Sequence, residues 1–215
     1  MSRSVNDVVA DFFAESDTKT YVKDTILTMP GEDLRHVTYL VKGMIEQYDI
    51  TPEGNKIVVN IFKPGAFFPM SWAMNDTPNS YFFAAMSNVA VKHVQPDAAV
   101  QFLKDNPDVT FDLLSRVYRG TDAVLRRLVL ASSGTASARL IFELIIEAYR
   151  FGTNEGDDGV SITVKQSSLA ARSGLARETV SRELYKLEQG GLVVRSKQGI
   201  LVYIDKLEEK LNVAI

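Results

Sequence analysis

Two arginines, a glutamate and a serine gather on one face of a helix predicted over residues 177–189. Val180, Leu184 and Leu187 recur at the spacing of three and four residues that marks a buried helix face. The other face carries Arg177 at its rim, then Glu178, Ser181, Arg182 and Tyr185. A guanidinium can donate two parallel hydrogen bonds to a guanine edge, and a carboxylate can accept one from the amino group of cytosine. The pattern favours a DNA recognition helix, and the alternative is a solvated face with incidental charge pairs.

The residues around this helix predict a winged helix-turn-helix. A turn at Gly174 precedes the helix, and Gly190 and Gly191 end it. Apolar and polar residues then alternate over 192–204 around Gly199, which is typical of a β-hairpin. The chain has a formal net charge of −3, but seven basic residues stand against three acidic ones over residues 162–198. Positive charge is therefore concentrated where a polyanion would bind.

The first half of the chain predicts a β-roll or jelly roll. Short runs of β-forming residues occupy 37–41, 44–50, 56–62 and 89–94. Turn residues separate them at 30–31, 42–43, 52–55 and 64–65. Short strands at this spacing are typical of closed or two-layered antiparallel folds.

A long helix is predicted to follow, because Asn106, Pro107 and Asp108 offer a cap, a proline for the first helical position and an acid in the first turn. Its apolar residues recur at intervals of three and four, as in a coiled-coil seam. They are Leu114, Val117, Thr121, Val124, Leu128 and Ala131. We expect this stripe to pair with a second copy of the chain, and the alternative is packing on the β-roll.

Residues 132–135, Ser-Ser-Gly-Thr, favour caps and turns and predict a hinge between domains. We expect a sensory domain over 1–105, a dimerisation helix over 106–132 and a DNA-binding domain over 133–215. Within the last, a helix over 137–149, a solvated loop over 151–159 and a strand over 160–164 are predicted.

In its order of parts and in one motif, the chain resembles the CRP/FNR superfamily of bacterial transcription regulators. The motif comprises Leu169, Ala170, Gly174, the run 177–182, Leu184, Leu187, Glu188, Gly191 and Leu192. The resemblance covers nearly the whole length. It implies an α+β fold with an N-terminal β-roll or jelly roll, a long dimerisation helix and a C-terminal winged helix-turn-helix.

The resemblance also implies a homodimer that binds an inverted repeat in double-stranded DNA, with half-sites ~34 Å apart. Matched to the family's motif, Arg177, Glu178 and Arg182 are the base readers, Ser181 holds a further reading position and Thr179 lies near the phosphate backbone. A TGTGA-like or TTGAT-like half-site is implied, and RNA polymerase is a partner if the protein activates. Phosphate contacts, with ordinary exposed side chains as the alternative, are assigned to Lys165, Gln166, Ser167, Arg172 and Lys197.

Two helix starts depart from the family's pattern. Lys165 stands where a serine or threonine usually opens the first helix of the motif, and Ala176 stands where the recognition helix often has a serine cap. Each loss is expected to cost ~1 kcal/mol of local helix stability.

The sensory half departs further. Cyclic-nucleotide-binding members carry a glycine-glutamate pair for the ribose and an arginine-serine pair for the cyclic phosphate. Here Pro69–Met70 and Asn79–Ser80 fall at those places, although the turn at Pro64–Gly65 is kept. Methionine does not accept a hydrogen bond of carboxylate strength and asparagine carries no charge. We therefore predict that the protein does not bind cyclic AMP in the usual manner.

Apolar side chains surround these positions and could line a pocket for a hydrophobic effector, although plain core is the stronger interpretation. The pocket residues are Phe67, Phe68, Met70, Trp72, Asn79, Ser80 and Phe82. No cofactor and no metal are predicted. The chain has no cysteine, which excludes cysteine-ligated iron–sulfur clusters. Haem would need an axial ligand from His36 or His93, and we expect His93 to be a surface or core residue instead.

An enzyme is not expected. A cupin-type metal site needs two or three histidines and a carboxylate, whereas the two histidines here are 57 residues apart with no His-x-His pair. A ligand sensor that binds only protein partners is a third possibility, disfavoured by the basic helix.

No apolar stretch approaches the ~20 residues that span a bilayer, and no hydrophobic signal core follows the first residues. We therefore expect a cytoplasmic protein without membrane contact.

Overall fold

The computed structural model describes residues 4–156 and 159–211. Its contacts divide the chain into two compact units, Met1–Thr121 and Asp122–Ile215. Helix α4 (Pro107–Ser133) contributes to both units, and its bounds differ by one residue from the helix predicted over 106–132. Residues 157–158 of the predicted loop lie outside the described residues. No helix in the described ranges is long and apolar enough to cross a membrane.

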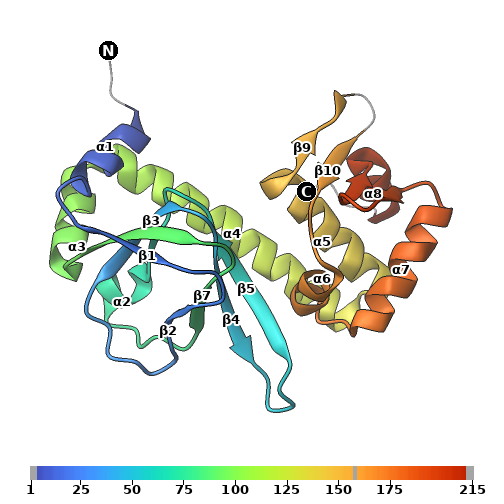
Figure 1. Cartoon of the computed structure of the whole chain (residues 1–215), viewed down its shortest axis with the longest axis horizontal. Helices are drawn as coiled ribbons and strands as arrows, with labels where there is room; N and C mark the ends of the chain where they lie inside the picture. Colours follow the sequence, from blue (N-terminus) through green and yellow to red (C-terminus); the bar gives the residue numbers. More distant parts are fainter. Residues whose placement is uncertain (1–3, 157–158, 212–215) are drawn as a thin grey trace. The chain divides into compact units, whose positions relative to one another are not determined.

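Two four-stranded antiparallel sheets form the centre of the N-terminal unit (Figure 1). The first sheet has the order β1 (Thr18–Tyr21), β8 (Val89–Val94), β3 (Val37–Lys42) and β6 (Phe67–Phe68). The second has the order β2 (Ile26–Thr28), β7 (Phe82–Ala85), β4 (Ile45–Ile50) and β5 (Lys56–Phe62). Leu40 and Val91 from the first sheet and Ile45 and Phe83 from the second share one buried core. The predicted β-roll is therefore confirmed, with the four expected strands as β3, β4, β5 and β8.

Helices α1 (Val5–Phe12), α2 (Met70–Asn75) and α3 (Pro96–Asp105) were not expected from the sequence. A second core joins α1, α3 and the start of α4 to β3 through Val9, Phe13, Val37, Phe102 and Val109. Phe12 also stacks on Phe102 with ring centroids 4.0 Å apart. These short helices have too few turns for apolar periodicity to reveal them, and tertiary packing stabilises them instead.

The apolar stripe of α4 is exposed. Leu114, Val117, Val124 and Leu128 are between 44% and 62% exposed. Leu114 and Val117 belong to the same unit as the β-roll, and their exposure speaks against the alternative that this part of the stripe packs on it. The expected cap at Asn106 differs in detail. Its amide Nδ2 donates to the Phe102 carbonyl at 2.8 Å, so the side chain closes the end of α3.

The C-terminal unit is a winged helix-turn-helix, as predicted. Helix α5 (Ala136–Phe151) precedes α6 (Gln166–Ser173), α7 (Arg177–Gln189) and the short helix α8 (Ile204–Leu211). A four-stranded sheet has the order β11 (Val193–Arg195), β12 (Ile200–Val202), β10 (Val160–Ile162) and β9 (Thr153–Asn154). The predicted hairpin is β11 and β12. Helix α5 extends two residues beyond the predicted end, and β9 falls within the predicted loop.

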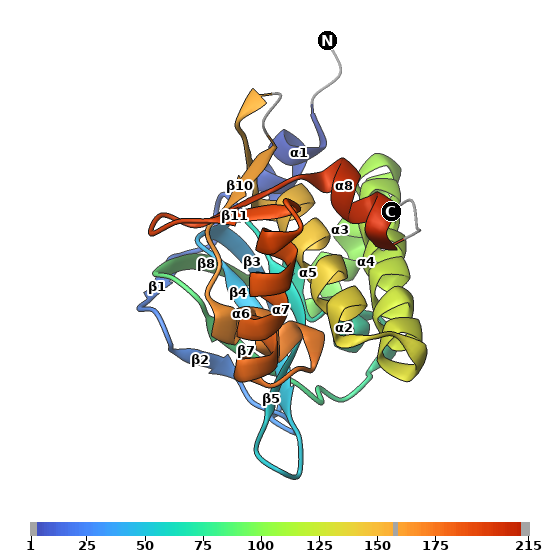
Figure 2. The same cartoon turned by 90° about the vertical axis from the view of Figure 1, so that its right-hand side faces the viewer.

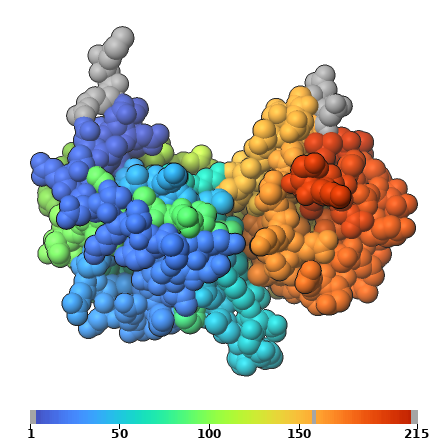
Figure 3. All heavy atoms as spheres, viewed as in Figure 1, coloured from blue at the N-terminus to red at the C-terminus, as the bar shows by residue number. Residues whose placement is uncertain are grey.

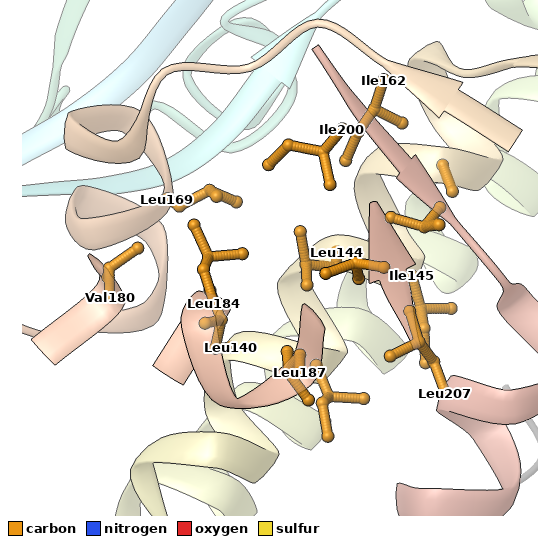
Figure 4. Close-up of a cluster of buried hydrophobic side chains, with 14 residues drawn as sticks. Leu140, Leu144, Ile145, Ile162, Leu169, Val180, Leu184, Leu187, Ile200 and Leu207 are labelled. Atoms are coloured by element: carbon orange, nitrogen blue, oxygen red, sulfur yellow. The ribbon is translucent and has the colours of Figure 1, made fainter. Parts of the chain in front are cut away.

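The core of this unit collects one apolar face from each helix (Figure 4). Leu140 and Leu144 from α5, Leu169 from α6 and Leu184 from α7 are completely buried and converge in the close-up. At about 2 kcal/mol for each fully buried leucine, this cluster fixes the orientation of α6 and α7. The orientation of α7 in turn decides which of its side chains face solvent.

Candidate nucleic-acid interface

Helix α7 turns its polar face outward because its apolar face is anchored in the core. Val180 and Leu184 have no exposed surface, and Leu187 is 2% exposed. Arg177, Glu178, Ser181 and Arg182 are all exposed. Figures 2 and 3 show α7 at the outside of its unit, drawn in orange. The predicted division of the helix into a core face and a polar face is therefore observed.

The turn between α6 and α7 depends on glycine. Gly174 ends α6 in the left-handed conformation, with φ of +64°. A side chain with a Cβ atom is disfavoured there by about 1 kcal/mol. This sharp turn brings α7 across α6, so that Gln166 at the start of α6 lies near the reading face.

The reading face forms an open hollow of about 680 Å³. It is lined by Gln166, Arg177, Glu178, Ser181, Arg182, Tyr185 and Arg195. The structure thus brings together five of the residues assigned to DNA contacts. Lys165, Ser167 and Lys197 are exposed but do not line the hollow, and Thr179 is half-buried.

Two residues of this hollow, Tyr185 and Arg195, were not among the predicted contacts. Helical spacing already places Tyr185 on the reading face, and its side chain is 55% exposed. Arg195 lies in the wing strand β11, and only the tertiary structure brings it beside α7. Its Nε and its backbone N–H each donate to the Glu188 carboxylate at 2.9 Å. These hydrogen bonds lower the pKa of Glu188 and tie the wing to the recognition helix.

The Arg182 guanidinium is only loosely paired. Its Nε lies 3.9 Å from Oε1 of Glu183, and the side chain is 64% exposed. The same Glu183 oxygen accepts a hydrogen bond of 2.7 Å from Nζ of Lys186, so this carboxylate has a closer cationic partner. An exposed ion pair of this kind contributes at most about 1 kcal/mol. Arg182 is therefore available to a base or a phosphate.

The capping departures are present in the structure. Among the described residues, Lys165 and Ala176 occupy the N-cap positions of α6 and α7 without a side-chain hydrogen bond. By contrast, Thr135 caps α5 by accepting from the N–H of Ala138 at 3.1 Å. Backbone N–H groups at the start of α7 thus remain without side-chain acceptors, beside Arg177.

The assignment of Arg172 to a phosphate contact is wrong. Its side chain is only 4% exposed, and its Nη1 donates to the Glu147 carboxylate on α5. Glu143, also on α5 and 1% exposed, accepts from Nε and Nη2 of Arg127 on α4 at 2.5 and 3.0 Å. Arg172 therefore belongs to a buried ion network that joins α4, α5 and α6, where a phosphate does not reach it.

In the β-roll, the side-chain amide of Asn79 is hydrogen-bonded to backbone groups of the protein. Its Nδ2 donates to the carbonyls of Met29 at 3.0 Å and Tyr81 at 2.7 Å, and its Oδ1 accepts from the Tyr81 N–H at 3.1 Å. The residue is 9% exposed. Ser80 beside it is exposed, and Pro69 serves as N-cap of α2. Asn79 and Pro69, two of the positions compared with the family's nucleotide site, thus fulfil structural tasks here.

The other residues predicted for an effector pocket do not share one space. Phe67 belongs to the core under α1 and α3, whereas Phe68 belongs to the core between the sheets. Phe82 stacks on Tyr48 with ring centroids 5.0 Å apart. Met70 and Trp72 are half-buried on α2. The pocket itself stays a prediction.

Comparison with known proteins finds similarity along both units. Two family models match, a cyclic nucleotide-binding domain over residues 18–106 and a Crp-like helix-turn-helix domain over residues 138–210. The global nitrogen regulator of Synechocystis sp. is 25% identical over 193 residues, which cover 86% of this chain and 84% of the regulator. The cAMP-activated global transcriptional regulator CRP of Pasteurella multocida is 21% identical over 201 residues, which cover 93% and 96%.

Solved structures share the fold. A CooA mutant from Carboxydothermus hydrogenoformans superposes with a TM-score of 0.82 at 19% identity, covering 98% of this chain and 97% of the other. The arrangement of β-roll, long helix and helix-turn-helix therefore recurs in a protein of distant sequence.

Proposed function

This chain belongs to the CRP/FNR superfamily of bacterial transcription regulators, and we propose that it acts as a homodimer that binds an inverted-repeat operator. The relatives named above are transcription regulators and not enzymes. The observation that carries the proposal is the exposed face of α7, where two guanidinium groups and a carboxylate stand over a rigid core. A cytoplasmic location accords with this role.

The dimer is supported by the exposed stripe of α4. Its apolar side chains, together with Phe111 at 73% and Tyr118 at 67% exposure, would be costly to leave in water over a helix of 27 residues. A second copy of the same helix offers a matching seam. Two recognition helices would then enter successive major grooves ~34 Å apart.

Base reading is assigned to Arg177, Glu178 and Arg182, with Ser181 between them and Thr179 toward the phosphates. Bidentate contacts from the two arginines to guanines supply the specificity, at about 1–3 kcal/mol each. Lys165, Gln166, Ser167 and Lys197 position the domain on the backbone without reading sequence. The hydrogen bonds of Asn79 to backbone carbonyls support the prediction that cyclic AMP is not bound.

Selection from a random duplex library tests this function. We expect enrichment of an inverted repeat with TGTGA-like or TTGAT-like half-sites, bound by two chains, with affinity that falls steeply between low and moderate salt. Enrichment of a single asymmetric site by one chain, or no enrichment at all, would contradict the proposal.

A further inference from the structure

The only two histidines of the chain become neighbours through strand register. Thr38 on β3 lies directly opposite His93 on β8, and Val37 lies opposite Val94. His36 directly precedes β3, and its ring lies beside that of His93. The two histidines are 57 residues apart in the sequence, which argued against a shared metal site, but strand pairing brings them together in space.

The two imidazoles lie at the edge of a pocket. Their ring centroids are 4.6 Å apart, with an angle of 48° between the ring planes. They line a hollow of about 280 Å³ together with Phe12, Ser16, Gln95 and Ala98. The pocket thus offers two nitrogen donors, a hydroxyl and an amide oxygen in otherwise apolar surroundings.

A side-chain contact at Nδ1 orients the ring of His93. Nδ1 of His93 lies 3.2 Å from Oγ1 of Thr38, whose residue is 8% exposed. This contact leaves Nε2 as the nitrogen of His93 for another partner. Metal-binding histidines are typically oriented in this way by a hydrogen bond at their second nitrogen. The His93 ring is partly buried, and this burial, followed by the neighbouring His36 and by Lys19, lowers the pKa of His93 to about 4.

We propose that His36 and His93 bind a divalent late transition-metal ion such as Cu²⁺, Ni²⁺ or Zn²⁺. Two imidazoles that share an ion at about 2.0–2.1 Å hold their ring centres roughly 4.5–5.2 Å apart, a range that includes the observed separation. Ser16, Gln95 or water completes the coordination in the pocket. This site lies in the N-terminal unit and does not depend on the proposed DNA-binding function.

The ligand set selects the class of ion. No group of three or more His, Cys, Asp or Glu suited to a metal occurs among the described residues, so hard cations such as Ca²⁺ and Mg²⁺ lack the carboxylates that they require. Ions that favour imidazole remain, with affinities that follow the order Zn²⁺ and Ni²⁺ below Cu²⁺. The positive charge of Lys19 and the partial burial disfavour a dication, so we expect a weaker site than a closed structural zinc centre.

Histidine-selective NMR of the untagged full-length protein tests the proposal, because the chain contains only two imidazoles. Titration with Zn²⁺ should shift the ring signals of His36 and His93 together, with one saturation curve at one equivalent. His36→Asn should weaken binding at least about tenfold as measured on His93. Thr38→Val, which keeps both rings, should weaken it about 10- to 100-fold.

A His36→Asn/His93→Asn double variant is the control for metal bound at other groups. If Zn²⁺ shifts only one ring or neither, the proposal is overturned. It is also overturned if the double variant retains the wild-type affinity in a calorimetric titration. A wild-type affinity in Thr38→Val would refute the orienting role of Thr38. The wild-type titration alone shows whether both ring signals shift together, so misfolding of a variant does not prevent the test.

Discussion

The reading face of α7 and the segment of the β-roll from Pro69 to Ser80 use their polar residues in opposite ways. On α7, Arg177 and Arg182 extend from a helix whose other face is buried, and their charged groups remain exposed. In the β-roll, Asn79 is buried, and its amide is consumed by hydrogen bonds to nearby backbone groups.

This difference shows why the family resemblance supports ligand binding by the side chains of α7 more strongly than by those of the β-roll. A side chain whose donors and acceptors are satisfied inside the protein cannot bind a ligand without breaking those bonds. An exposed guanidinium has no such cost. We therefore propose the family's DNA-binding role for α7 and predict that Asn79 takes no part in nucleotide binding.

The largest effect is expected when the reading face is removed. Arg177→Ala combined with Arg182→Ala should weaken binding to the selected operator at least about 30-fold, because each bidentate contact is worth about 1–3 kcal/mol. Fluorescence anisotropy at moderate salt measures the change. Arg35→Ala, an exposed arginine of the β-roll, is the matched control and should leave the affinity unchanged. Equal losses in the two variants would remove the distinction between the regions.

Buried charge in the C-terminal unit should matter for stability instead of recognition. Glu143→Ala removes a buried carboxylate that pairs with Arg127 and leaves Glu147 as the carboxylate beside Arg172, at a cost of about 3–5 kcal/mol in the free energy of unfolding. Urea denaturation gives this value. Lys56→Ala, which breaks the exposed pair with Glu46, should cost less than about 1 kcal/mol. A Glu143→Ala protein as stable as the wild type would show that the network is dispensable.

In the β-roll, the structural role of Asn79 is tested by truncation. Asn79→Ala removes the amide donor from the Met29 and Tyr81 carbonyls and the acceptor from the Tyr81 N–H, and the free energy of unfolding should fall by about 1–3 kcal/mol. Ser80→Ala, at the exposed neighbouring position, should change it by less than about 0.5 kcal/mol. The interpretation fails if the two substitutions have the same effect.

Stability should also depend on His93 in acid. Between its ordinary pKa of 6.5 and its folded pKa of about 4, the unfolded chain binds a proton that the folded chain does not. Stability is therefore lost as pH falls through this window, by about 2 kcal/mol or less after solvent screening. Urea titrations with a chelator at pH 7 and pH 4.5 should show a smaller loss for His93→Asn than for the wild type. An identical loss would contradict the assignment.

The smallest expected effect is that of cyclic AMP. Because Met70 and Asn79 are expected at the positions where cyclic-nucleotide-binding members carry a carboxylate and a guanidinium, saturating cyclic AMP should leave the melting temperature unchanged. Thermal shift measurements would detect binding, and a concentration-dependent rise would show that a nucleotide is recognised in another manner.

Long periodic segments could be predicted from the sequence, but short ones could not. The α4 and α7 helices, the four longer strands and the wing hairpin follow from apolar spacing and from turn residues such as Gly190 and Gly191. Helices α1, α2 and α8 span only six to eight residues, and their stability comes from packing that a single sequence does not display.

The residues of the candidate DNA interface were also predictable only where they lie within one helix. Arg177, Glu178, Ser181 and Arg182 share a helix face, and local spacing alone places them together. Arg195 reaches α7 only through the wing. Arg172 was misassigned because its burial against Glu147 depends on how α5 and α6 pack. Residues that meet within one element are predictable, whereas those that meet between elements require the structure.

The most direct test of the account is a double-mutant cycle between Arg182 and the guanine that it is expected to read. Replacing that guanine of the selected operator by 7-deazaguanine removes the N7 acceptor. The wild-type protein should lose about tenfold in affinity, whereas Arg182→Ala, already lacking the contact, should lose no more on the modified duplex. Equal losses for both proteins, at every guanine of the half-site, would contradict base reading by this helix.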